Sequence, residues 1–174
     1  MRINEIKQCV VDFRSAIDSA KASGLFKNHP MFSHFPKRSC LIASELLAEF
    51  LCRNGIDTLI IQGSGSNVDG THAWLAINDG GYRPTQTEEH FTNEVYEALR
   101  QYNPNIISDT IIRNEYDTDI IWRMDIADIT IDQFKIPAPY IGKPLELHKR
   151  YDIRPKVYNG QFDTSLYSII ANWL

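Results

Sequence analysis

The stretch Phe35–Gly55, FPKRSCLIASELLAEFLCRNG, is the one around which the rest of the chain is organised. Phe35 is predicted to be extended, because a residue that precedes proline is pushed out of the helical region. Ser39 can then serve as an N-cap. From Cys40 onward, apolar residues recur at three- and four-residue spacing until Asn54-Gly55, which predicts a largely buried helix. The apolar positions are Leu41, Ile42, Leu46, Leu47, Phe50 and Leu51.

Cys40 falls in the first turn of this predicted helix. Unpaired backbone N–H groups and the positive end of the helix dipole stabilise a thiolate at such a place, and Lys37 and Arg38 add positive charge. A cysteine in this position is suited to act as a nucleophile if a histidine accompanies it. Cys9 and Cys52 lack such a setting, and we expect them to be core residues.

Composition indicates an ordinary globular protein with reduced thiols. The 174 residues are 43% hydrophobic and 23% charged, which is enough for one domain with a substantial core. The three cysteines include no C-x-x-C pair and no zinc-binding spacing. Cys40 and Cys52 lie about 18 Å apart on one helix, so they cannot form a disulfide with each other.

Charge and hydropathy narrow the possible partners and compartments. The net charge of −4 and the lack of a basic stripe with interleaved aromatics argue against nucleic-acid binding. No apolar run approaches the roughly 20 residues needed to span a bilayer. The N-terminus, MRINEIKQCVVDF, has acidic and polar residues where a signal peptide needs an apolar stretch. We therefore expect a cytoplasmic protein with no membrane partner.

Periodicity predicts the other elements of the chain. Helices are expected at Ile3–Ala22, Glu88–Gln101 and Thr164–Leu174, and strands at Thr58–Gln62, Thr71–Ile77 and Asp119–Thr130. Irregular segments are expected at Leu25–Lys37 and Lys135–Leu147, a loop at Gly63–Gly70, and a tight turn at Asn78–Gly81. The pattern at Ile106–Asn114 fits either a strand or a short helix. We find no internal repeat.

A cysteine nucleophile needs a histidine to take its proton and an acceptor to orient that histidine. His72 is the best histidine candidate, because it opens a strand directly after a glycine-rich loop and can reach the rim of a sheet. Asp128 is the best acceptor. Alternation from Trp122 places it on a buried face, where an unpaired carboxylate is costly. Asp125, on the opposite face, and Asp132, past the strand end, rank lower.

The other histidines, His29, His34, His90 and His148, show no partner pattern and are interpreted as surface or loop residues. Taken singly, each candidate has an ordinary structural interpretation. A free cysteine is usually an inert core residue, a strand histidine is usually structural, and an aspartate near a strand end usually caps a turn. The order of helix-start Cys, strand His and strand Asp is much less expected by chance.

The segments FPKRSCLIASELLAEFL, THAWLAI and IADITIDQF together resemble the transglutaminase-like branch of the papain-like cysteine enzymes, particularly small bacterial and phage members. The similarity runs from about Phe35 to Phe134. It implies Cys40 as nucleophile, His72 as general base and then acid, and Asp128 as the orienting partner. The fold it implies is α+β and papain-like, with helices packed on an antiparallel sheet.

One departure from the family pattern concerns the acid. His72 and Asp128 are 56 positions apart, whereas the family usually joins them through a short hairpin. Residues 81–119 would therefore be an insertion within a single domain of residues 1–174. A rival alignment puts GGYRPTQT in the hairpin position, with Gln86 or Thr85 replacing the acid. Asp128 is favoured because D-I-T-I-D-Q-F matches over more positions.

The resemblance implies an enzyme that acts through an acyl-enzyme on amide or thioester bonds of a protein or peptide-like substrate. Peptidase, deamidase, transglutaminase and acyltransferase activities share those steps and stay open. No cofactor or metal is implied. The backbone N–H of Cys40 is a natural oxyanion donor, and a second could come from Gln133 or from a side chain upstream of Cys40. The alternative is a catalytically silent papain-like domain that binds a protein partner. The oligomeric state stays open.

Overall fold

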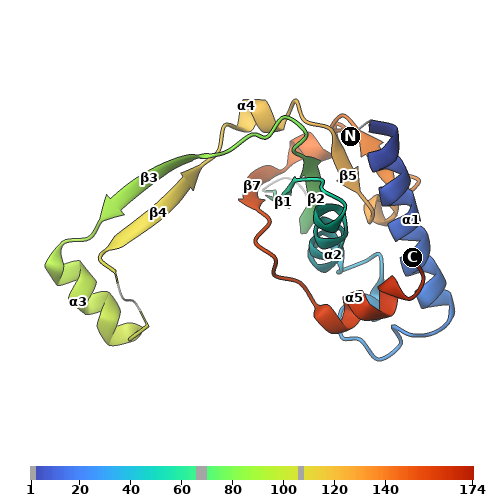
Figure 1. Cartoon of the computed structure of the whole chain (residues 1–174), viewed down its shortest axis with the longest axis horizontal. Coiled ribbons are helices and arrows are strands. Elements are labelled where there is room, and N and C mark those ends of the chain that lie inside the picture. The colour runs from blue at the N-terminus through green and yellow to red at the C-terminus, as the bar shows by residue number, and fades with distance from the viewer. Residues whose placement is uncertain (1–2, 66–69, 106–107) are drawn as a thin grey trace. The chain divides into compact units, whose positions relative to one another are not determined.

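The computed structural model describes residues 3–65, 70–105 and 108–174 and has an α+β fold (Figure 1). The chain divides into two compact units, one comprising Met1–Gly81 with Thr118–Leu174 and the other Tyr82–Asp117. The segment predicted as an insertion, residues 81–119, covers the second unit. Across the described residues, none of the helices combines the length and apolar character needed to cross a membrane.

The first unit has helices on a five-stranded antiparallel sheet. Its helices are α1 (Ile3–Ala22), η1 (Phe32–His34), α2 (Cys40–Arg53), α4 (Thr118–Ile121), η2 (Ile131–Phe134), η3 (His148–Arg150) and α5 (Thr164–Ala171). Its strands are β1 (Thr58–Ser64), β2 (Thr71–Ile77), β5 (Ile126–Asp128), β6 (Tyr140–Gly142) and β7 (Asp152–Val157). The strand order is β6-β5-β2-β1-β7.

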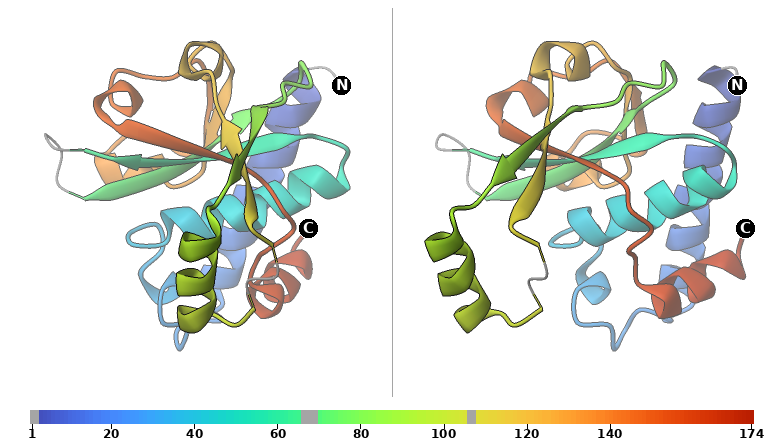
Figure 2. Two further views of the ribbon diagram at one scale, coloured as in Figure 1. Left: turned by 90° about the vertical axis from the view of Figure 1, so that its left-hand side faces the viewer. Right: turned by 60° about the vertical axis from the view of Figure 1, so that its left-hand side comes forward.

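The main core lies between this sheet and the helices. α2 lies against β1 and β2, and α1 packs on α2 and α5, so these helices gather on one face of the sheet (Figure 2). The apolar stripe of α2 supplies Leu46, Leu47 and Leu51, which are completely buried in one core cluster with Phe13 of α1. Each such side chain contributes about 1.5–3 kcal/mol on burial. The helix that begins at Cys40 is therefore firmly anchored.

The second unit is a strand pair that carries one helix. β3 (Thr85–His90) pairs antiparallel with β4 (Thr110–Glu115), and α3 (Asn93–Tyr102) lies between them in the chain. The predicted helix Glu88–Gln101 is thus wrong at its start, because Glu88 to His90 pair with β4 and Thr92 caps the helix by accepting from Val95 N. β4 resolves the open prediction at Ile106–Asn114 as a strand, although residues 106–107 lie outside the described residues.

Several element predictions agree with the structure. α1 and β2 have the predicted bounds, and α2 begins at Cys40 as expected. The predicted helix Thr164–Leu174 is confirmed over Thr164–Ala171, and a turn is present at Asn78–Gly81. Ser39 takes the N-cap position of α2, but its hydroxyl donates to the carbonyl of Pro36 instead of accepting from the helix.

Other predictions are corrected. The strand predicted at Asp119–Thr130 is wrong over most of its length, because α4 occupies its start and only β5 finds ladder partners, on β2 and β6. β7 was not predicted. It contains Pro155, which lacks an N–H donor and is tolerated because β7 is an edge strand. The predicted loop Gly63–Gly70 begins later, since β1 continues to Ser64, and residues 66–69 lie outside the described residues.

Candidate active site

His72 lies in β2 directly opposite Gly63 of β1. Its side chain is buried, and its ring packs edge-on against Phe134 with centroids 4.9 Å apart. Gly63 is required here by space, since a Cβ at that position would lie 2.7 Å from the Cβ of Tyr151. The glycine predicted to begin a flexible loop therefore allows β1 to approach the aromatic cluster around His72.

Asp128 ends β5 and is saturated with hydrogen-bond donors. Its Oδ2 lies 2.6 Å from Nε2 of His72, and its Oδ1 accepts from the backbone N–H and the hydroxyl of Thr130 at 3.0 Å and 3.2 Å. The carboxylate is buried, as predicted from the sequence, although the long strand used to argue that burial is not present. Asp128 is thus placed to hold the ring of His72 in one orientation.

His148 is a second histidine on the same carboxylate, and its interpretation as a surface or loop residue is wrong. It is completely buried, and its Nε2 lies 3.3 Å from Oδ2 of Asp128. The backbone N–H of Leu145 donates to Nδ1 of His148 at 3.1 Å. Because Nδ1 accepts, the proton of the neutral ring is on Nε2, and His148 donates to Asp128.

The charges of the site follow from these contacts. Burial acts to lower the pKa of His72, but hydrogen bonds with Asp128 and Cys40 outweigh it and raise that pKa from 6.5 to about 9. Burial acts to raise the pKa of Asp128, but hydrogen bonds from His148, His72 and the Thr130 backbone lower it from 3.8 to about 2. At neutral pH, His72 is therefore an imidazolium held by a carboxylate.

Cys40 is partly buried at the start of α2, and its proximity contributes to the raised pKa of His72. Asp128 takes Nε2 of His72, so Nδ1 is the nitrogen that faces the thiol. Cys40 and His72 line the same cavity of about 180 Å³, together with Gln62, Gly63 and Arg154. The structure thus brings together the three residues singled out in the sequence, and two of them border open space.

The other two cysteines have different settings. Cys9 is partly buried in α1, and burial raises the pKa of its thiol. Cys52 is exposed, so its prediction as a core residue is wrong. Cys52 is not among the buried residues of α2, because an apolar stripe covers only part of the surface of a helix.

Gln133, considered in the sequence as an oxyanion donor, lies beside His72. Its Nε2 is 3.1 Å from Nδ1 of His72. A half-turn of the amide presents Oε1 instead, so Gln133 can donate to the unprotonated ring or accept from the imidazolium. This residue therefore contacts the same nitrogen that faces Cys40.

The competing acids and amides have other partners. Asp125 pairs with Lys143 at 2.9 Å, and Asp132 pairs with Arg14 at 2.7 Å. Thr85 and Gln86 lie in β3 of the second unit, where Gln86 donates to Asn114. Among the described residues, Asp128 is the carboxylate that bonds His72.

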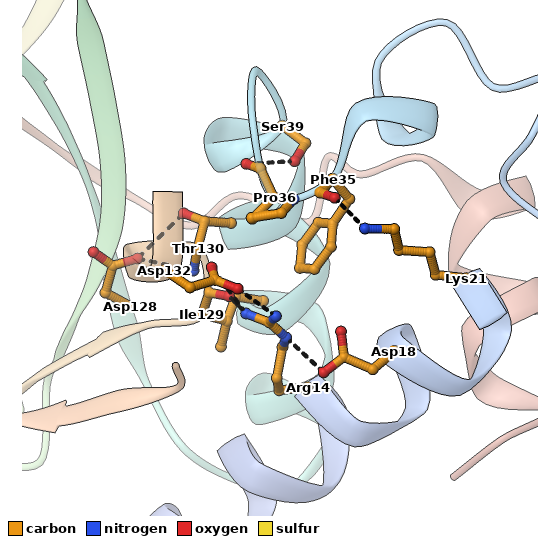
Figure 3. Close-up of polar contacts among 10 residues, drawn as sticks. All are labelled: Arg14, Asp18, Lys21, Phe35, Pro36, Ser39, Asp128, Ile129, Thr130 and Asp132. Carbon is orange, nitrogen blue, oxygen red and sulfur yellow. Dashed lines mark hydrogen bonds and ion pairs between the residues drawn. The ribbon is translucent and has the colours of Figure 1, made fainter. Parts of the chain in front are cut away.

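A buried arginine supports the two segments that carry Cys40 and Asp128 (Figure 3). Arg14 of α1 donates to the carbonyl of Ile129, next to Asp128, and forms a two-pronged pair with Asp132. Its guanidinium also lies over the ring of Phe35, 4.8 Å from the centroid, on the approach to Cys40. Lys21 of the same helix donates to the carbonyl of Phe35 at 2.6 Å. One helix thus holds both segments.

His72, Asp128 and His148 are also a possible ligand set for a metal ion, since their ligand atoms lie within 4.8 Å of one another. Two ligands about 2.1 Å from a tetrahedral ion are about 3.4 Å apart. The 2.6 Å separation of His72 Nε2 and Asp128 Oδ2 is instead that of a short charge-assisted hydrogen bond. Binding a cation would also require His148 to lose its Nε2 proton. The geometry fits the hydrogen-bonded arrangement better.

Comparison with protein-family models, with curated proteins and with solved structures gave no significant match for this chain. The resemblance to transglutaminase-like enzymes therefore stays a prediction from the sequence.

Proposed function

We propose that this protein is a cysteine enzyme that acts through an acyl-enzyme on amide or thioester bonds, with Cys40, His72 and Asp128 as its catalytic triad and a papain-like arrangement of its α+β fold. The observation that carries the proposal is the position of His72, which bonds the buried carboxylate of Asp128 and lines the same cavity as Cys40. Nucleophilic catalysis by a thiol requires that arrangement.

The chemistry proceeds in two steps. The Cys40 sulfur attacks the substrate carbonyl carbon, and the new C–S bond pushes the carbonyl electrons onto oxygen. Backbone N–H groups at the start of α2 are suited to stabilise that oxyanion. When the tetrahedral intermediate collapses, the imidazolium of His72 protonates the departing amine or thiolate, and the acyl group stays on sulfur.

Water or an amine then resolves the acyl-enzyme. His72, now neutral, takes a proton from the attacking group and becomes an imidazolium again, and the C–S bond breaks to release the product and restore the Cys40 thiolate. Asp128 forms no bond to substrate. It keeps the imidazole oriented and stabilises its positive charge in both steps. Hydrolase and acyltransferase outcomes differ only in the group that resolves the intermediate.

The test is capture of the acyl-enzyme. The protein is incubated with a panel of amides and thioesters, and acyl adducts are located by intact mass and peptide mapping. We expect the adduct on Cys40, its loss in Cys40→Ala, and its retention in Cys52→Ala, which removes an exposed thiol. If no substrate acylates Cys40, or if adducts fall mainly on Cys52, the enzyme proposal fails and a binding domain is favoured.

A further inference from the structure

The cavity at Cys40 has a cation on its wall. Arg154, in β7, lines this cavity together with Cys40 and His72. β7 pairs with β1 so that Arg154 lies directly opposite Gln62, which lines the cavity as well. Directly opposed residues on neighbouring strands present their side chains on the same face of the sheet. A guanidinium and an amide therefore stand side by side at the proposed nucleophile.

The guanidinium of Arg154 has no protein partner among the described residues, to which it makes neither a hydrogen bond nor an ion pair. Two arginines of the first unit differ, since Arg14 pairs with Asp132 and Arg53 pairs with Glu49. A guanidinium offers five N–H donors in a planar fork that matches a carboxylate. An unpaired fork that borders a cavity is thus free to take an anionic group of a ligand.

Charges near Arg154 on its own strand largely offset each other. Asp152 and Lys156 lie two positions before and after it, on the same face, and all three residues are exposed. Neither lines the cavity, whereas Arg154 does. The charge presented to a group inside the cavity from this strand is therefore positive and comes from Arg154.

We propose that this cavity selects acyl groups that carry a carboxylate, which Arg154 and Gln62 bind while Cys40 attacks the neighbouring carbonyl. The substrate class is thus an amide or thioester of a dicarboxylic acyl group, such as a glutamyl residue. The rest of the wall suits the aliphatic part of such a group, since it includes Leu41, Gly63 and Ala73. This inference rests on the proposed function, because it assigns the substrate of the same nucleophile.

The experiment uses two irreversible probes of nearly equal size, the chloromethyl ketones of N-acetyl-glutamate and N-acetyl-glutamine. The second-order rate of Cys40 labelling is measured for each by peptide mapping, with the exposed Cys52 as an internal reference. A charge-assisted contact should favour the glutamate probe by about tenfold in the wild type. In Arg154→Met, this ratio should fall to about one. Lys156→Met is the matched control, since it removes an equal charge from the same face of the same strand and should leave the ratio unchanged.

The outcomes separate the two proposals. Rapid labelling of Cys40 by both probes with no preference, or a preference that survives in Arg154→Met, overturns the carboxylate site and leaves the cysteine enzyme standing. A preference lost equally in Lys156→Met also overturns it, because the effect would then be a general one of surface charge. Labelling of Cys40 no faster than of Cys52 with either probe overturns the proposed enzyme and this inference together. Thermal melting of each variant verifies that it is folded.

Discussion

Asp128→Asn tests the buried network most directly, because the carboxylate accepts four hydrogen bonds that an amide cannot reproduce. His72 and His148 share Oδ2, and the N–H and hydroxyl of Thr130 share Oδ1. An amide has one oxygen and one NH2 group. If the oxygen stays with Thr130, the NH2 group faces both imidazoles. If the amide is turned around, its NH2 group faces the backbone N–H of Thr130.

Only one of the two imidazoles can adapt. His72 can accept from the amide if its Nε2 loses its proton and the ring keeps the proton on Nδ1. His148 cannot, because its Nδ1 already accepts from the backbone of Leu145. One donor therefore stays buried and unsatisfied in either orientation, at a cost of about 1–3 kcal/mol, and the lost charge-assisted bonds add about 1.5–3 kcal/mol. We expect the free energy of unfolding to fall by about 3–5 kcal/mol at neutral pH, in the range of a broken buried ion pair.

The assay is urea unfolding of the wild type, Asp128→Asn and the control Asp125→Asn. The control removes a carboxylate that is 33% exposed and paired with a 68% exposed Lys143, so it should cost less than about 1 kcal/mol. The rate of acyl-enzyme formation should fall by about 10²–10⁴ in Asp128→Asn and leave a measurable remnant, because the displaced proton on Nδ1 of His72 faces Cys40. A stability loss below about 1 kcal/mol, or an unchanged rate, would refute the reasoning.

Three further outcomes are expected. Iodoacetamide at neutral pH should label Cys40 first, the exposed Cys52 at an ordinary thiol rate and Cys9 last, since burial raises the pKa of Cys9; equal rates by mass spectrometry would contradict this. Cys40→Ser should abolish acyl-enzyme formation with an unchanged melting curve, because a hydroxyl is a far weaker nucleophile in this setting, and full activity would end the nucleophile assignment. The pKa of Asp128 is lowered from 3.8 to about 2, so its stabilisation is present above pH 3.8 and lost as pH falls towards 2. His148→Phe removes a donor to that carboxylate and should move the acid limb of the stability curve to higher pH, whereas an unmoved limb would contradict the contact.

The elements predicted at the right bounds are those that local sequence determines. α1 ends where Ser23-Gly24 interrupts its stripe, and α2 ends at Asn54-Gly55. The prediction of a strand at Asp119–Thr130 was wrong because it was based on composition alone. A strand also needs a neighbouring strand with which to pair. Only β5 has such neighbours, and both β2 and β6 lie outside the predicted segment.

His148 was not predicted as a site residue for the same reason, because its contact joins residues that are distant in sequence. Its partner Asp128 is 20 positions away, and no local motif joins them. A weaker signal was present, since Leu145, His148 and Tyr151 recur at three-residue spacing, and His148 and Tyr151 are both buried. That spacing in a proline-rich segment indicates a short helical turn with one inward face, which would have placed the histidine inside the protein.

The contacts of Arg14 that hold the segment after Asp128 are not predicted by any local sequence motif. Arg14 is in the middle of α1, where its sequence setting fits an ordinary charge on a helix surface, and Asp18 one turn later completes a common surface pair. Its other partners, Ile129 and Asp132, lie more than a hundred positions away. A buried guanidinium must be fully bonded to be tolerated, so each of these contacts constrains the loop after Asp128. The position of the acid of the triad therefore depends on a helix that carries none of the triad residues.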